Sequence, residues 1–183
     1  MNRTYDLQSS FREVVAGLVS GDFSALEPLF ADQAVSDQRR CRILDWYVAG
    51  CFAEEPKALA EALTCACFLG CAAVADFLLT EGVDPTAGNG TGMNAFHWAA
   101  NRGQLETVKL LIKWNAPLEV ENMYGGTVLG TTIWSAINEP RNEQLAVIQA
   151  LLDAGALVRA SDYPSGDRCI DEILLQSTNS ESQ

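Results

Sequence analysis

Histidine is nearly missing from this sequence: His97 is the only one among 183 residues. With one histidine, a histidine-based zinc site or a Ser–His–Asp arrangement is difficult to assemble. Carboxylates are numerous, but none stands in a paired acid–base motif. We therefore expect a protein that is not an enzyme and that holds no metal and no cofactor.

Long apolar runs are also missing. The first residues, MNRTYDLQSSFREVV, lack a basic stretch followed by an apolar one, and no apolar run approaches about 18 residues. We therefore expect no signal peptide and no membrane span. The six cysteines are then expected to stay reduced in a cytoplasmic protein.

Basic residues are scarce. The chain has 12 Lys and Arg against 24 Asp and Glu, which gives a formal net charge of −12. Binding to phosphates requires the opposite sign, so we expect no nucleic-acid partner. The charge permits a basic protein partner, although solubility is the simpler explanation for it.

The sequence does contain an internal period of 33 residues, read as a repeat. Residue pairs at this separation are Gly92 and Gly125, Asn94 and Thr127, Phe96 and Leu129, His97 and Gly130, and, going backwards, Gly103 and Gly70, Leu111 and Leu78, and Ile112 and Leu79. So many coincidences at one spacing indicate successive copies of one structural unit.

Within a period the pattern is helix, turn, helix, loop. Residues 95–101 form a short first helix with small side chains, and Gly103 permits the turn. Leu105, Val108 and Leu111 then follow at helical spacing and form one apolar face of a second helix. Such a pair cannot cover its own apolar face, so stacking on equivalent neighbours must bury it.

These residues resemble ankyrin repeats. The family pattern G-x-T-P-L-H-x-A-A-x-x-G is met by Gly92, Phe96, His97, Ala99, Ala100 and Gly103. The chain departs from it at Asn94 and Ala95, where Thr-Pro is usual, and at Gly130, where His is usual. The resemblance, which extends to bacterial ankyrin-repeat proteins, implies an all-α solenoid of helix–turn–helix units with finger loops, of about four repeats plus terminal caps.

The repeat register predicts the organisation of the chain. An N-terminal helical cap and degenerate repeat is expected at 1–58, with Gly21 as a turn and Ser24 and Glu27 as a capping box. Repeats follow at 59–91, 92–124 and 125–158, the last with an insertion near 138–144. A C-terminal cap at 159–176 and a flexible tail at 177–183 complete the prediction.

Three features have structural as well as chemical interpretations. His97 is expected to be the ankyrin histidine that bonds backbone groups of the loop between repeats, an interpretation that the resemblance implies. In CACFLGC, Cys67 stands where Ala100 stands one repeat later, so packing explains it better than metal binding. The glycine string 88–92 lacks the Lys-Ser/Thr of a phosphate loop, and we expect a finger turn there.

In ankyrin arrays, partners usually touch the finger tips and the exposed edge of each first helix. Carried onto this chain, that concave face comprises Thr91, Met93, Asn101, Arg102, Met123, Tyr124, Trp134 and Ser135. We therefore predict a monomeric module that binds a protein partner, whose identity the sequence does not give. Two alternatives remain: an enzyme or small-ligand protein with a pocket under the insertion near Cys71, His97 and Trp134, and a self-assembling structural protein.

Overall fold

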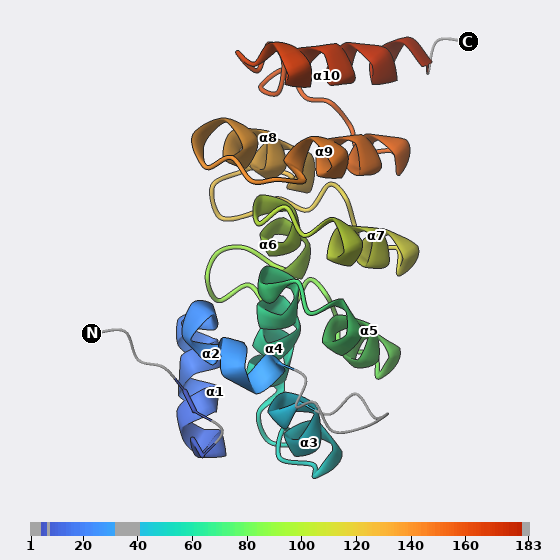
Figure 1. Ribbon diagram of the computed structural model, residues 1–183. Helices are drawn as coiled ribbons and strands as arrows, with labels where there is room; N and C mark the ends of the chain where they lie inside the picture. Colours follow the sequence, from blue (N-terminus) through green and yellow to red (C-terminus); the bar gives the residue numbers. More distant parts are fainter. Residues whose placement is uncertain (1–4, 7, 32–40, 181–183) are drawn as a thin grey trace. The chain divides into compact units, whose positions relative to one another are not determined.

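The computed structural model describes residues 5–6, 8–31 and 41–180, and within them the regular structure is entirely helical (Figure 1). The predicted fold class is thereby confirmed. The chain forms two compact units that divide after Ala95. Across the described ranges, each helix is too short or too polar to cross a membrane.

The two units are described separately. The first contains α1 (Phe11–Ser20), α2 (Phe23–Phe30), α3 (Arg42–Val48), α4 (Pro56–Leu69) and α5 (Ala72–Thr80); the second contains α6 (Ala95–Asn101), α7 (Leu105–Lys113), α8 (Val128–Asn138), α9 (Gln144–Asp153) and α10 (Arg168–Ser180).

Helix α4 is the centre of the first unit, because α1, α2 and α5 all pack against it. It is buried on most sides, which requires small side chains such as Ala62, Ala66 and Cys67. Their size lets neighbouring helices approach closely. Burial also raises the pKa of the Cys65 and Cys67 thiols, which keeps them protonated and unreactive. The packing role predicted for Cys67 is confirmed.

Helix α1 begins with a capping box. Ser10 Oγ accepts a hydrogen bond from the Glu13 N–H at 3.4 Å, and the Glu13 carboxylate accepts one from the Ser10 N–H at 3.1 Å. The capping box predicted at Ser24 is wrong, because α2 already begins at Phe23 and its N-cap is Asp22. Gly21 does form the predicted turn, with a φ of +75°.

A loop that follows α5, residues 81–94, is fastened to α4 by two buried side chains. Thr64 Oγ1 donates to the Gly88 carbonyl at 2.8 Å, and the Glu61 carboxylate accepts from the Gly90 N–H at 2.7 Å. A Cβ on Gly88 would lie 2.5 Å from the Ala60 carbonyl oxygen. Glycine is therefore required there because the loop backbone touches the helix.

The second unit is built from helix pairs in successive layers, α6 with α7, α8 with α9, and then α10 (Figure 1). Helix α9 is central to it and packs against α7, α8 and α10. Its Val147, Ile148 and Leu151 are fully buried. Between α6 and α7 the chain turns at Gly103, whose φ of +68° favours glycine as the sequence predicts.

Helix α8 is longer than its counterpart one repeat earlier, with 11 residues against seven in α6. The residues predicted as an insertion therefore form the end of α8, at Asn138, and the link to Gln144, the first residue of α9. Helix α10 buries Ile170 and Leu174, one helical turn apart. It continues to Ser180, past residue 176, where the flexible tail was expected to follow.

We predict that Thr64→Val lowers the free energy of unfolding by about 1–3 kcal/mol, because valine keeps the shape of the side chain but leaves the buried Gly88 carbonyl without its donor. Thr132→Val is the matched control. Thr132 is equally buried, but its hydroxyl donates only to the Val128 carbonyl within its own helix, at 2.8 Å. Urea unfolding of both variants checks the difference, and equal losses would contradict it.

Candidate functional site

The loop between α7 and α8 forms a finger, residues 116–126, whose tip is closed by Asn122. The Asn122 N–H donates to the Gly126 carbonyl, and the Gly125 N–H donates to the Asn122 carbonyl, both at 2.9 Å. The Asn122 side chain accepts from the N–H groups of Tyr124 and Gly126, at 2.9 and 3.0 Å, and donates to Thr131 Oγ1 at 2.9 Å. One side chain thus orders the turn and joins it to α8.

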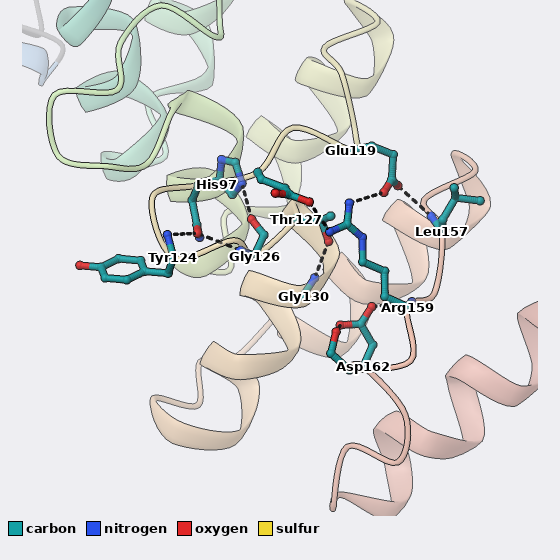
Figure 2. Close-up of polar contacts among 12 residues, drawn as sticks. His97, Glu119, Tyr124, Gly126, Thr127, Gly130, Leu157, Arg159 and Asp162 are labelled. Atoms are coloured by element: carbon teal, nitrogen blue, oxygen red, sulfur yellow. Dashed lines mark hydrogen bonds and ion pairs between the residues drawn. The ribbon is translucent and has the colours of Figure 1, made fainter.

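His97 holds the base of the finger. Its Nε2 lies 3.1 Å from the Gly126 carbonyl oxygen (Figure 2), and the ring also makes a backbone hydrogen bond to Val120. The ring is fully buried, and burial lowers the pKa of His97 although both backbone bonds favour the protonated form. The structural role predicted for His97 is confirmed.

In the next repeat, the loop that follows the helix pair is ordered without a histidine. Gly130 stands at the position of His97, and a Cβ there would lie 3.1 Å from Asp162 Oδ1. The buried Asp162 carboxylate accepts from the Arg159 N–H at 2.8 Å and so orders its own loop. Thr127 Oγ1 accepts from the Gly130 N–H at 3.1 Å and caps α8. A glycine at 130 leaves room for this carboxylate.

The finger is also tied to the loop after α9. Arg159 Nη1 lies 2.6 Å from a Glu121 carboxylate oxygen, and Nη2 lies 3.6 Å from one of Glu119 (Figure 2). Glu119 accepts in addition from the Leu157 N–H at 2.9 Å. These contacts join residues 38 or 40 positions apart in the sequence, so the finger is held on the side of the following repeat as well as by His97.

Two predicted binding residues project from the tip of this braced finger. Met123 is 68% exposed and Tyr124 is 79% exposed. The Tyr124 ring points away from the polar network that orders the finger (Figure 2). Tyrosine and methionine are enriched at the centres of protein interfaces. The tip therefore offers two such side chains on a backbone that is already ordered.

Two other predicted binding residues are internal. Ser135 Oγ donates to the Asn101 carbonyl at 2.8 Å. Gln144 Nε2 lies 3.1 Å from the same carbonyl and 2.6 Å from Ser135 Oγ, and all three residues are buried. The prediction that Asn101 and Ser135 face a partner does not match this burial. Gln144, at the end of the insertion, hydrogen-bonds both the Asn101 carbonyl and the Ser135 hydroxyl, the two groups that also join α6 to α8.

Arg102 and Trp134 are accessible in the same region. Trp134 is 54% exposed, and so the ring is not covered by the insertion. Ile137, three residues further along α8, is 44% exposed. Arg102 is half-buried, and the pKa of its guanidinium is lowered by burial and by the charge of Arg141, with Glu139 acting in the opposite direction.

The last two predicted binding residues lie in the first unit. Met93 is 8% exposed, so its side chain belongs to the interior. Thr91 is half-buried beside the turn at Gly21, and its hydroxyl donates to the Met93 carbonyl at 3.3 Å. In this loop the side chains serve packing, in contrast to the exposed tip at residues 123 and 124.

The alternative pocket at Cys71, His97 and Trp134 draws on both units: Cys71 is the N-cap of α5, in the first unit, whereas the other two belong to the second. His97 is engaged by backbone bonds, and Trp134 is exposed. Within the described ranges, no group of three or more His, Cys, Asp or Glu side chains is placed to hold a metal ion.

Sequence reasoning missed the polar residues that fasten the loops. Asn122 was detectable, since an asparagine shortly before a Gly-Gly pair, as in Asn-Met-Tyr-Gly-Gly, is typical of a turn closed by its side chain. Glu61 and Gln144 gave no such signal, because each contacts a segment that lies far away in the sequence. Only the folded chain brings those groups together.

Comparison with known proteins identifies the fold family. The family described as "Ankyrin repeats (3 copies)" matches residues 62–162, so the chain belongs to the ankyrin-repeat family. The crystal structure of EF0377, an ankyrin repeat protein, superposes with a TM-score of 0.54 and 15% sequence identity, covering 92% of this chain and 99% of that chain. No curated protein matches the sequence.

Ankyrin repeats are generally protein–protein interaction modules, and proteins of the family are typically non-enzymatic. The family thus supplies a class of function, while the partner depends on the side chains that each chain presents.

We predict that His97 titrates below its ordinary value of 6.5, because burial opposes its charge. A folded-state pKa below that of the unfolded chain stabilises the fold above pH 6.5, and this contribution is lost as the pH falls. As the only histidine, His97 gives an unambiguous NMR titration. A measured pKa at or above 6.5 would show that the ring is not buried as described.

We predict that Asn122→Ala destabilises the fold by about 1–3 kcal/mol and increases hydrogen exchange at the amides of Tyr124 and Gly126, which lose their acceptor. Asn138→Ala is the control, because that exposed side chain donates only to the Trp134 carbonyl. We expect it to change stability by less than about 0.5 kcal/mol. Unchanged exchange at the finger in Asn122→Ala would contradict the role assigned to this residue.

Proposed function

We propose that the second unit is a protein-binding module that recognises its partner on the concave face of the repeats, through the finger tip and the exposed side of α8. The observation that carries the proposal is the tip itself, where Met123 and Tyr124 are exposed on a finger fastened at its turn and at its base. Large exposed side chains lower the solubility of a monomer. Their presence on a rigidly held loop therefore favours a binding role.

Rigidity matters because association must offset the entropy lost when side chains and loops become ordered. The finger backbone is already fixed by Asn122, His97 and the ion pairs of Arg159. Only the tip side chains remain to be ordered by a partner. Such an arrangement supports affinity from a small number of contacts.

The proposed face keeps Met123, Tyr124, Arg102 and Trp134 of the residues predicted from sequence. It leaves out Asn101 and Ser135, whose polar groups bond α6 to α8, and also Thr91 and Met93, which belong to the packed loop of the first unit. The remaining side chains are of types that dominate interface energetics, above all tyrosine, tryptophan and arginine.

The test is capture of partners from native lysate on the immobilised chain, comparing the parent with the double variant Met123→Ala/Tyr124→Ala. We expect the variant to lose partner capture by at least about tenfold while melting like the parent, because both side chains project into solvent. Leu145→Ala, an exposed apolar residue on α9, is the matched control and should retain capture.

Retention of the same proteins by parent and double variant would reject the finger tip as the binding site. Retention of a second copy of this chain alone would favour the self-assembly alternative instead. Sedimentation of the purified protein at several concentrations separates these results, since a binding module for another protein should stay monomeric.

A further inference from the structure

A second group of side chains, two exposed on α8 and two partly buried beside it, lies in the same unit around the insertion. We call it the arginine–tryptophan surface: Arg102, Trp134, Ile137 and Arg141. Trp134 and Ile137 belong to α8, whereas Arg102 follows α6 and Arg141 lies in the link between α8 and α9; buried hydrogen bonds fasten these segments to one another. Ser135 Oγ donates to the Asn101 carbonyl at 2.8 Å. Trp134 and Arg102 are the sequence neighbours of these two residues, so this hydrogen bond fixes the segments that carry them.

The insertion brings a second positive charge to Arg102. Arg141 Cβ lies 3.4 Å from where a Cβ of Gly103 would stand, next to Arg102 in the chain. Gln144 fixes this approach, because its carboxamide accepts from the Arg141 N–H at 3.0 Å and donates to the Asn101 carbonyl at 3.1 Å. Arg141 is thereby placed near Arg102, and its charge contributes to lowering the pKa of the Arg102 guanidinium.

The chain itself indicates which counter-ion this pair accepts. A Glu139 carboxylate oxygen lies 3.4 Å from Arg141 Nη2, and its negative charge acts on Arg102 as well. A carboxylate therefore already fits beside these groups. Arg159 in the same unit is different, since two carboxylates, those of Glu119 and Glu121, flank its guanidinium.

The apolar part of the surface is one face of α8. Trp134 and Ile137 are three residues apart, so their side chains lie on the same side of the helix. Both are exposed, although burial of either apolar side chain would be favourable. An apolar side chain of a partner would recover part of that free energy.

We propose that the arginine–tryptophan surface binds an acidic peptide segment of the partner protein, with its carboxylates on the two arginines and an apolar side chain on α8. This proposal rests on the binding function proposed above and adds the chemistry of the partner. It differs from what the net charge of −12 suggests, because long-range attraction would favour a basic partner. Pairing of guanidinium with carboxylate acts at short range and decides register and specificity.

The experiment is selection from a random peptide library with the whole chain as bait, read as the composition of the enriched sequences. We expect enrichment of Asp and Glu next to an aromatic or aliphatic residue. Arg141→Gln and Trp134→Ala should each reduce this enrichment at least about tenfold. Arg141→Glu should shift it toward Lys and Arg, a result that loss of folding cannot produce. Arg168→Gln, at an arginine of α10 that pairs with Glu172, is the control and should enrich the same peptides as the parent.

Enrichment of basic or uncharged peptides, or of none, would overturn the proposal, as would acidic peptides that still bind Arg141→Glu. The Met123→Ala/Tyr124→Ala variant separates this failure from that of the proposed function. Basic or uncharged peptides lost in that variant would leave the finger tip as the binding site and reject only the acidic partner. Peptides that depend on neither group of residues would reject both proposals.

Discussion

The loops of this protein depend on one constraint: a backbone carbonyl or N–H that leaves a helix and is buried must find another partner. Three different side chains meet it in three loops. Glu61 bonds Gly90 in the first unit, His97 bonds Gly126 in the second, and Asp162 bonds Arg159 after α9. The three residues stand at different places in the repeat register, so the same constraint recurs in each loop while the position and the type of the residue that meets it vary.

The way in which each loop is held determines which of its side chains remain exposed and available for binding. In the first unit, Met93 is drawn into the interior of a loop that lies against α4. In the second, Asn122 closes the turn within the finger itself, so Tyr124 at the tip has no role in holding the loop and projects outward. The same constraint produces a packed loop in one unit and an exposed hot-spot candidate in the other.

Periodicity was enough to predict the helices, because Val108 and Leu111 recur at helical spacing and Gly103 marks the turn where only glycine is unstrained. It was not enough for the binding face. Asn101 and Ser135 stand at positions that face solvent in a regular repeat, but Gln144 from the insertion reaches them and buries both. The repeat period predicts the contacts that all repeats have in common. An insertion changes the neighbours of residues that otherwise follow the repeat pattern.

The insertion therefore has two physical effects that oppose each other. Gln144 removes polar groups from the surface and binds α6 to α8, while Arg141 adds a positive charge beside Arg102. Repulsion between two guanidinium groups costs free energy in the isolated chain, and a structural role alone would be served better by a neutral residue at position 141. Glu139 offsets part of this cost at a partly exposed position, where ion pairs contribute little. The acidic partner proposed above would add a carboxylate beside Arg141, and binding would then account for the charge at this position.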